Sequence, residues 1–92
     1  MIVVRLPPGL AEEVGAPTRA SLGGAAADVA AVIAALEARY PAIRRRLTEA
    51  DGELRPHIAV FVDDLDARRH GGVRAPVRDG AEVWFLRAIS GG

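Results

Sequence analysis

Residues 28–41 read DVAAVIAALEARYP, and this stretch decides the fold. Its larger apolar residues recur at the i, i+3, i+4, i+7 and i+11 positions of one helical face: Val29, Val32, Ile33, Leu36 and Tyr40. The alanines between them are strong helix formers, and Asp28 stands where an N-cap acceptor is needed. Pro41 pushes the residue before it out of helical geometry. The stretch therefore predicts one amphipathic helix that ends just before Pro41.

Short apolar runs on both sides of this helix are typical of strands, two before it and two or three after it. We expect these strands over residues 2–6, 18–22, 58–62, 65–69 and 83–89. The first two would pair as a hairpin. A second, shorter helix is expected over 42–47, and a loop or one helical turn over 10–14. This order predicts an α+β roll, a mixed sheet with the main helix packed across it, in a single domain over 1–92.

The composition limits the chemistry that the chain can perform. Twelve basic residues balance twelve acidic ones, so we expect no non-specific nucleic-acid binding, which needs a basic surface. The absence of cysteine excludes thiol catalysis and thiolate metal sites, and the absence of lysine excludes Schiff-base chemistry on a side chain. No apolar run approaches the ~20 residues of a membrane span, and no signal-peptide pattern is visible. We expect a cytoplasmic protein without a membrane partner.

Polar residues offer little catalytic machinery. His57 and His70 are the only histidines, and neither stands near a nucleophile or at metal-ligand spacing from the other. Asp63, Asp64 and Asp66 lack the glycine and the later glutamate of a calcium-binding EF-hand loop. A solvated turn explains the three aspartates. We therefore predict neither a catalytic residue nor a metal site.

Strand alternation predicts an exposed apolar patch on the sheet. The β-branched residues of the third strand share one face, which we assign to the core: Ile58, Val60 and Val62. Phe61 then points to the other face. Glu82 is unsuited to burial, which places Trp84 and Leu86 on the outer side of the last strand. If the two strands are neighbours, Phe61, Trp84 and Leu86 form a surface for a partner protein. The alternatives are a loop that covers them or a register shifted by one residue.

The sequence finishes on Ser90-Gly91-Gly92 directly after the last strand. Two glycines without a Cβ allow this stem to thread a narrow channel. At ~3.3 Å per residue, Ile89 to Gly92 would reach about 13 Å from the sheet. We expect a tail over 88–92 that delivers a carboxylate into another protein's active site. The alternative is an ordinary frayed end.

Three segments resemble the ubiquitin-like sulfur carriers of the MoaD/ThiS family. They are LEARYPAIRRRL at 36–47, GELRPHIAVFVDDLDARRHGG at 52–72, and DGAEVWFLRAISGG at 79–92. The middle segment is similar to the carrier subgroup used in bacterial cysteine biosynthesis. The resemblance implies a β-grasp fold and a protein cosubstrate that is not itself an enzyme.

The resemblance also implies a mechanism and partners. An E1-like enzyme would spend ATP to adenylate the Gly92 carboxylate, and a sulfur donor would then displace AMP to leave a thiocarboxylate. That sulfur would pass to a biosynthetic enzyme. Gly92 would carry the AMP and then the sulfur, Gly91 and Ser90 would thread the tail, and no cofactor would be bound permanently. Phe61, Trp84 and Leu86 fall where family members place their partner-facing surface.

Several alternatives stay open at this stage. Cysteine biosynthesis is the favoured pathway, followed by molybdopterin synthesis and a secondary-metabolite pathway. Family members often have an asparagine in or after the third strand, where this chain has Ala59 and Asp63-Asp64. Many also have a proline before the tail, where this chain has Arg87-Ala88. A different class of function is a non-covalent β-grasp interaction or regulatory module, which would use the sheet face and not need the tail.

Overall fold

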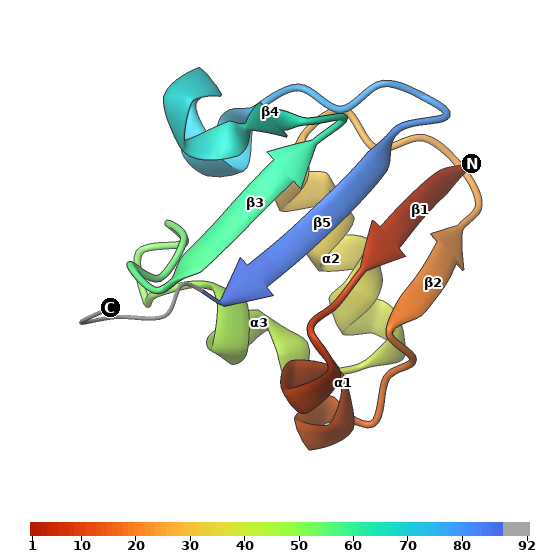
Figure 1. Cartoon of the computed structure of the whole chain (residues 1–92), viewed down its shortest axis with the longest axis vertical. Helices are drawn as coiled ribbons and strands as arrows, with labels where there is room; N and C mark the ends of the chain where they lie inside the picture. The colour runs from red at the N-terminus through yellow and green to blue at the C-terminus, as the bar shows by residue number, and fades with distance from the viewer. Residues whose placement is uncertain (88–92) are drawn as a thin grey trace.

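The structure is a computed structural model that describes residues 1–87. The expected strand end at Ile89 and the tail, with Ser90, Gly91 and Gly92, lie outside the described residues. Five strands form one mixed sheet in the order β2-β1-β5-β3-β4 (Figure 1). They are β1 Ile2–Arg5, β2 Arg19–Leu22, β3 Ile58–Val62, β4 Leu65–Asp66 and β5 Glu82–Arg87. The expected α+β roll is thus present.

The pairing places β5 at the centre of the sheet. It runs parallel to β1 and antiparallel to β3, while β1–β2 and β3–β4 are antiparallel pairs. The predicted first hairpin is therefore confirmed. Because β5 leads toward the C-terminus, the centre of the sheet also determines where the tail begins.

The main helix, α2, spans Val29–Arg39 and packs across one face of the sheet (Figure 1). The carboxylate of Asp28 accepts a 2.8 Å hydrogen bond from the backbone N–H of Ala31, as an N-cap should. Four of the five residues on the predicted face are fully buried, and Tyr40 packs against the core. The following helix, α3, spans Ile43–Leu47, one residue shorter than expected.

The segment before β2 is more helical than the sequence indicated. A helix, α1, spans Pro8–Val14, where we expected a loop or one turn over 10–14. Pro8 lies in its first turn and Gly15 closes it with φ 72°, the proline-first, glycine-last arrangement that helices favour. Burial of Leu10 and Ala11 anchors α1 on the core.

The expected strand over 65–69 is mostly wrong. Only Leu65–Asp66 pair as β4, and a 3₁₀ helix, η1, follows over Ala67–His70. The Asp66 carboxylate accepts a 3.0 Å hydrogen bond from the backbone N–H of Arg68, which turns the chain into η1. A second 3₁₀ helix, η2, covers Gly72–Arg74. Arg68 in turn donates to the backbone carbonyl of Ile58 at 2.7 Å and so occupies the free edge of β3.

The core lies between α2 and one face of the sheet. Ile58, Val60 and Val62 point into it from β3, as predicted, and Phe85 and Val83 do so from β5 with no exposed surface. No helix among the described residues covers the opposite face, which is turned toward the viewer in Figure 1. Among residues 1–87, no helix combines the length and the apolar character needed to cross a lipid bilayer.

Candidate functional site

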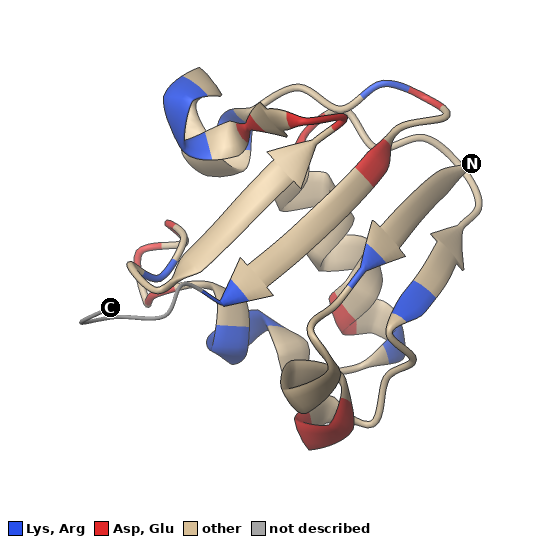
Figure 2. Ribbon diagram, viewed as in Figure 1, with Lys and Arg blue, Asp and Glu red and all other residues tan. Residues whose placement is uncertain are grey.

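The uncovered sheet face carries the predicted apolar side chains side by side. In the β3–β5 register Phe61 lies directly opposite Trp84, and Ala59 lies opposite Leu86. Trp84 is 38% exposed and Leu86 39% exposed. Figure 2 shows that this part of β3 and β5 is uncharged, with charges only at the ends of β5. We call Phe61, Trp84 and Leu86 the sheet-face patch.

One member of the patch is less exposed than we predicted. Phe61 is only partly accessible. Its register partners are Trp84 on one side and Asp66 on the other, so neighbours flank it on both strands. Trp84 and Leu86, on a strand whose outer face is open, supply the larger accessible surface.

Two charged residues that the sequence analysis did not assign to a site stand beside the patch. Arg5 is the register neighbour of Trp84 across the parallel β1–β5 pair. Its guanidinium lies 5.0 Å from the centroid of the indole ring, within cation–π range. Its Nε also donates a 3.1 Å hydrogen bond to a carboxylate oxygen of Glu82. Strand alternation alone places Arg5 on the outer face of the first strand. Its contact with Trp84 could not be predicted without knowing that β1 pairs with β5.

Glu82 is held in its ionised form by these neighbours. The indole N–H of Trp84, followed by the guanidinium of Arg5, keeps the pKa of Glu82 below its ordinary value of 4.5, while partial desolvation opposes them. Glu82, Trp84 and Arg5 thus form one polar unit along the edge of the sheet-face patch. Within this unit the Arg5 guanidinium contacts the indole on an otherwise open surface.

The coupling of Glu82 to Trp84 predicts a pH-dependent fluorescence signal. The depressed pKa of Glu82 means that its carboxylate stabilises the fold above the unfolded-state pKa, and that this contribution is lost as the pH falls through the folded-state value. Trp84 is the only tryptophan. We expect its emission to change in a transition centred below pH 4.5. Glu82→Gln should remove that transition, and its persistence in this variant would show that another carboxylate is responsible.

The end of β5 is fastened to two helices. One carboxylate oxygen of Glu13, in α1, accepts hydrogen bonds from Arg46 of α3 at 2.6 Å and from Arg87 at 2.7 Å. The hydrogen bond from Arg87 is the largest cause that holds the pKa of Glu13 below its ordinary value. Arg87 is the last residue described, so this three-residue cluster sets the base from which the tail starts. Sequence reasoning missed it because the three residues are far apart in the chain.

The aspartates and His70 that were considered earlier as site residues form turns or hydrogen-bond the backbone. Asp63 and Asp64 both have positive φ, 47° and 74°, and form the tight turn from β3 to β4. The Asp63 carboxylate accepts from the backbone N–H of Glu82 at 3.0 Å. His70 bonds the carbonyl of Asp66 through Nδ1 at 3.0 Å. Within residues 1–87 no three metal-ligating side chains gather.

The arrangement is suited to binding a protein and presenting its own chain end. Its parts are an apolar patch with an exposed indole and a central strand, β5, that ends five positions before Gly92. A mixed sheet of this order, crossed by one helix and open on its other face, defines a ubiquitin-like β-grasp protein, and its central strand leads to a Gly-Gly sequence.

The family follows from comparison with known proteins. The model of the ThiS family matches residues 4–92, and the chain belongs to that family. The sulfur carrier protein CysO of Mycobacterium tuberculosis is 33% identical over 93 residues, which cover 99% of this chain and 98% of the relative. The chain is a sulfur carrier of the CysO type, a protein substrate and not a catalyst.

Solved structures agree with this assignment. The crystal structure of the Amycolatopsis orientalis BexX/CysO complex aligns with a TM-score of 0.87 at 33% identity, covering 100% of both chains. The crystal structure of Mycobacterium tuberculosis CysO aligns with a TM-score of 0.86 at 32% identity, over 97% of this chain and 100% of that one. The β-grasp fold expected from the sequence is confirmed.

Proposed function

We propose that Gly92 carries sulfur as a C-terminal thiocarboxylate. An E1-like enzyme joins the Gly92 carboxylate to the α-phosphate of ATP and releases pyrophosphate. A hydrosulfide-equivalent donor then attacks the acyl carbon and displaces AMP, so that sulfur replaces one carboxylate oxygen. The thiocarboxylate sulfur is the nucleophile that a biosynthetic enzyme receives. Because ATP is consumed, we place the reaction in the cytoplasm.

The main support for this proposal is that the sheet-face patch lies on the same strand that precedes the tail. Trp84 and Leu86 face solvent from the strand that leads to residues 88–92, and Arg87 stands five positions before Gly92. A partner bound on the sheet-face patch is therefore within reach of the chain end. The family match through residue 92 supports the same assignment. The two glycines leave the last part of the tail without side chains that would obstruct a channel.

Cysteine biosynthesis is the pathway that we favour. The support is the similarity to CysO of Mycobacterium tuberculosis over nearly the whole of both chains. The acceptor would then be an activated serine derivative held on a biosynthetic enzyme. Molybdopterin synthesis is the second possibility and a secondary-metabolite pathway the third. The structural match to a CysO chain in complex with BexX shows that a protein similar to this one binds a partner protein.

Intact mass spectrometry of the protein from its own cells tests the proposal. We expect a species heavier by the difference between one sulfur and one oxygen atom, located at Gly92 by fragmentation. Incubation with ATP, a sulfur donor and cell lysate should increase that species. If only the plain carboxylate is found under both conditions, a non-covalent β-grasp module becomes the better explanation of the sheet-face patch.

The sheet-face patch gives a further prediction about partner affinity. Exposed aromatic residues at the centre of an interface often contribute about 2 kcal/mol or more to binding. We expect Trp84→Ala to raise the KM of the activating enzyme for the carrier by roughly 30-fold, with a smaller increase for Leu86→Ala. Steady-state kinetics of ATP-dependent thiocarboxylate formation measure both effects.

Leu65 provides a matched control for this experiment. It is 57% exposed, more than Leu86, but it lies in β4 at the sheet edge and outside the patch. Leu65→Ala removes the same side chain as Leu86→Ala and should leave KM unchanged. Equal effects of the two leucine substitutions would contradict a specific docking role for the sheet-face patch.

A further inference from the structure

A basic cleft lies at the base of the tail, apart from the sheet-face patch. It has a volume of about 550 Å³. Three segments form it: helix α3, the loop that precedes β3, and the end of β5. The residues that line it are Ala42, Arg45, Arg46, Arg55, His57 and Arg87. Four arginines therefore line one open cleft beside the last described residue of β5.

The positive charge in this cleft is only partly neutralised. Glu13 forms ion pairs with both Arg46 and Arg87, and Glu49 pairs with Arg55 at 3.1 Å. Arg45 makes no ion pair with any carboxylate among residues 1–87. Four arginines thus face two carboxylates, although the whole chain has equal numbers of basic and acidic residues.

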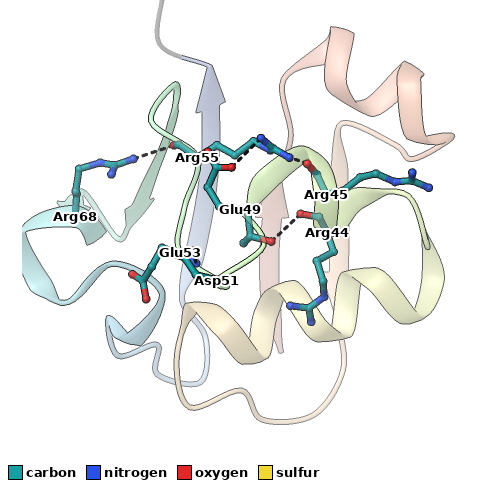
Figure 3. A network of polar contacts seen from close by, with 8 residues as sticks. Arg44, Arg45, Glu49, Asp51, Glu53, Arg55 and Arg68 are labelled. Carbon is teal, nitrogen blue, oxygen red and sulfur yellow. Dashed lines mark hydrogen bonds and ion pairs between the residues drawn. The ribbon is translucent and has the colours of Figure 1, made fainter.

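Arg55 is held in the cleft by hydrogen bonds to the backbone and to a carboxylate. Arg55 donates from Nε to the carbonyl of Arg45 at 2.7 Å, and its own carbonyl accepts from Arg68 at 3.1 Å. In Figure 3, Arg55 reaches across to α3, whereas the Arg45 side chain extends away from the network into the open. Three paired arginines with a fourth, exposed guanidinium beside them are suited to contact a carboxylate on another molecule.

We propose that this cleft docks an acidic rim on the activating enzyme that receives the tail. The proposal rests on the proposed function of Gly92. Five residues at ~3.3 Å each place Gly92 no farther than about 17 Å from Arg87. An enzyme whose active site encloses Gly92 is therefore close enough to contact the cleft as well, and carboxylates at the mouth of its channel would neutralise the excess charge. Contacts of this kind accelerate association and select between partners.

Charge reversal at Arg45 tests the proposal. The side chain of Arg45 is exposed and its carbonyl, not its guanidinium, bonds Arg55, so we expect Arg45→Glu to fold normally. Arg69→Glu in η1, also exposed, is the control with the same change in net charge. The assay is thiocarboxylate formation by the ATP-dependent activating enzyme purified from the same cells, measured against carrier concentration at several salt concentrations.

We expect Arg45→Glu to raise KM about tenfold or more, to leave kcat at saturation within about twofold, and to flatten the dependence of kcat/KM on salt. Arg69→Glu should change none of these. Equal behaviour of the two variants would overturn the docking role of the cleft while leaving sulfur transfer intact. Failure of the unaltered protein to form a thiocarboxylate would instead overturn the proposed function.

A second measurement separates a protein partner from a small anion. Inorganic phosphate is titrated into the unaltered carrier while the NMR signals of His57 and Arg45 are followed. We expect no saturable shift below millimolar phosphate, because the arginines are spread over an open cleft. Saturation at lower concentration, lost in Arg45→Glu, would identify the cleft as a small-anion site and overturn docking by an acidic rim.

Discussion

Deletion of Gly92 is expected to abolish thiocarboxylate formation. The deletion moves the terminal carboxylate back by one residue, about 3.5 Å. A displacement of ~1 Å at a reacting centre already costs about 100-fold in rate, so the loss should exceed that figure. The measurement is intact mass spectrometry after incubation with ATP, a sulfur donor and the activating enzyme. The described core ends at Arg87, so the thermal unfolding midpoint should not change.

Two variants of equal length serve as controls for this deletion. Ser90→Ala keeps the stem length and should be activated as well as the unaltered protein. Gly92→Ala also keeps the length but adds a Cβ at the reacting residue, and we expect an intermediate loss. Normal activation of the protein that lacks Gly92 would reject the carrier mechanism and favour the non-covalent module.

The main helix and the strand faces could be predicted from local patterns. The spacing of Val29, Val32, Ile33 and Leu36 alone determines which side of α2 is buried, because a helix repeats every 3.6 residues. The same holds for β3, where alternation separates Val60 from Phe61. These predictions succeed because burial on one face is written into neighbouring positions of the chain.

The polar contacts around the site could not be predicted in this way. Glu13 and Arg87 are separated by 74 positions, and Arg5 and Glu82 by 77. Each contact exists only because β5 inserts between β1 and β3, a pairing that no local pattern specifies. The η1 helix was missed for a different reason: one side-chain bond from Asp66 outweighs a weak strand propensity over 65–69. The basic cleft depends on the same tertiary arrangement.

Phe85→Ala should have the largest effect on stability. Phe85 is among the largest fully buried side chains and lies in the central strand, opposite Val60. Removing a buried phenylalanine costs about 3–5 kcal/mol, through lost burial and the cavity that remains. Domains of this size have only about 5–15 kcal/mol of stability in total. We expect a fall of more than ~12 °C in the unfolding midpoint, measured by circular dichroism, and a matching fall in the urea midpoint.

Trp84→Ala is the adjacent comparison, because Trp84 is next in sequence and faces solvent. It loses the contact with Arg5 and some exposed surface, so we expect about 1 kcal/mol or less. The two substitutions should therefore have different effects. Phe85→Ala strongly lowers the stability of the domain, whereas Trp84→Ala leaves the stability nearly unchanged and weakens partner binding. Comparable destabilisation by both would mean that the sheet face is covered, and the sheet-face patch would then be unavailable to a partner. Loss of binding without loss of stability would show that one strand uses its inner side for the fold and its outer side for recognition.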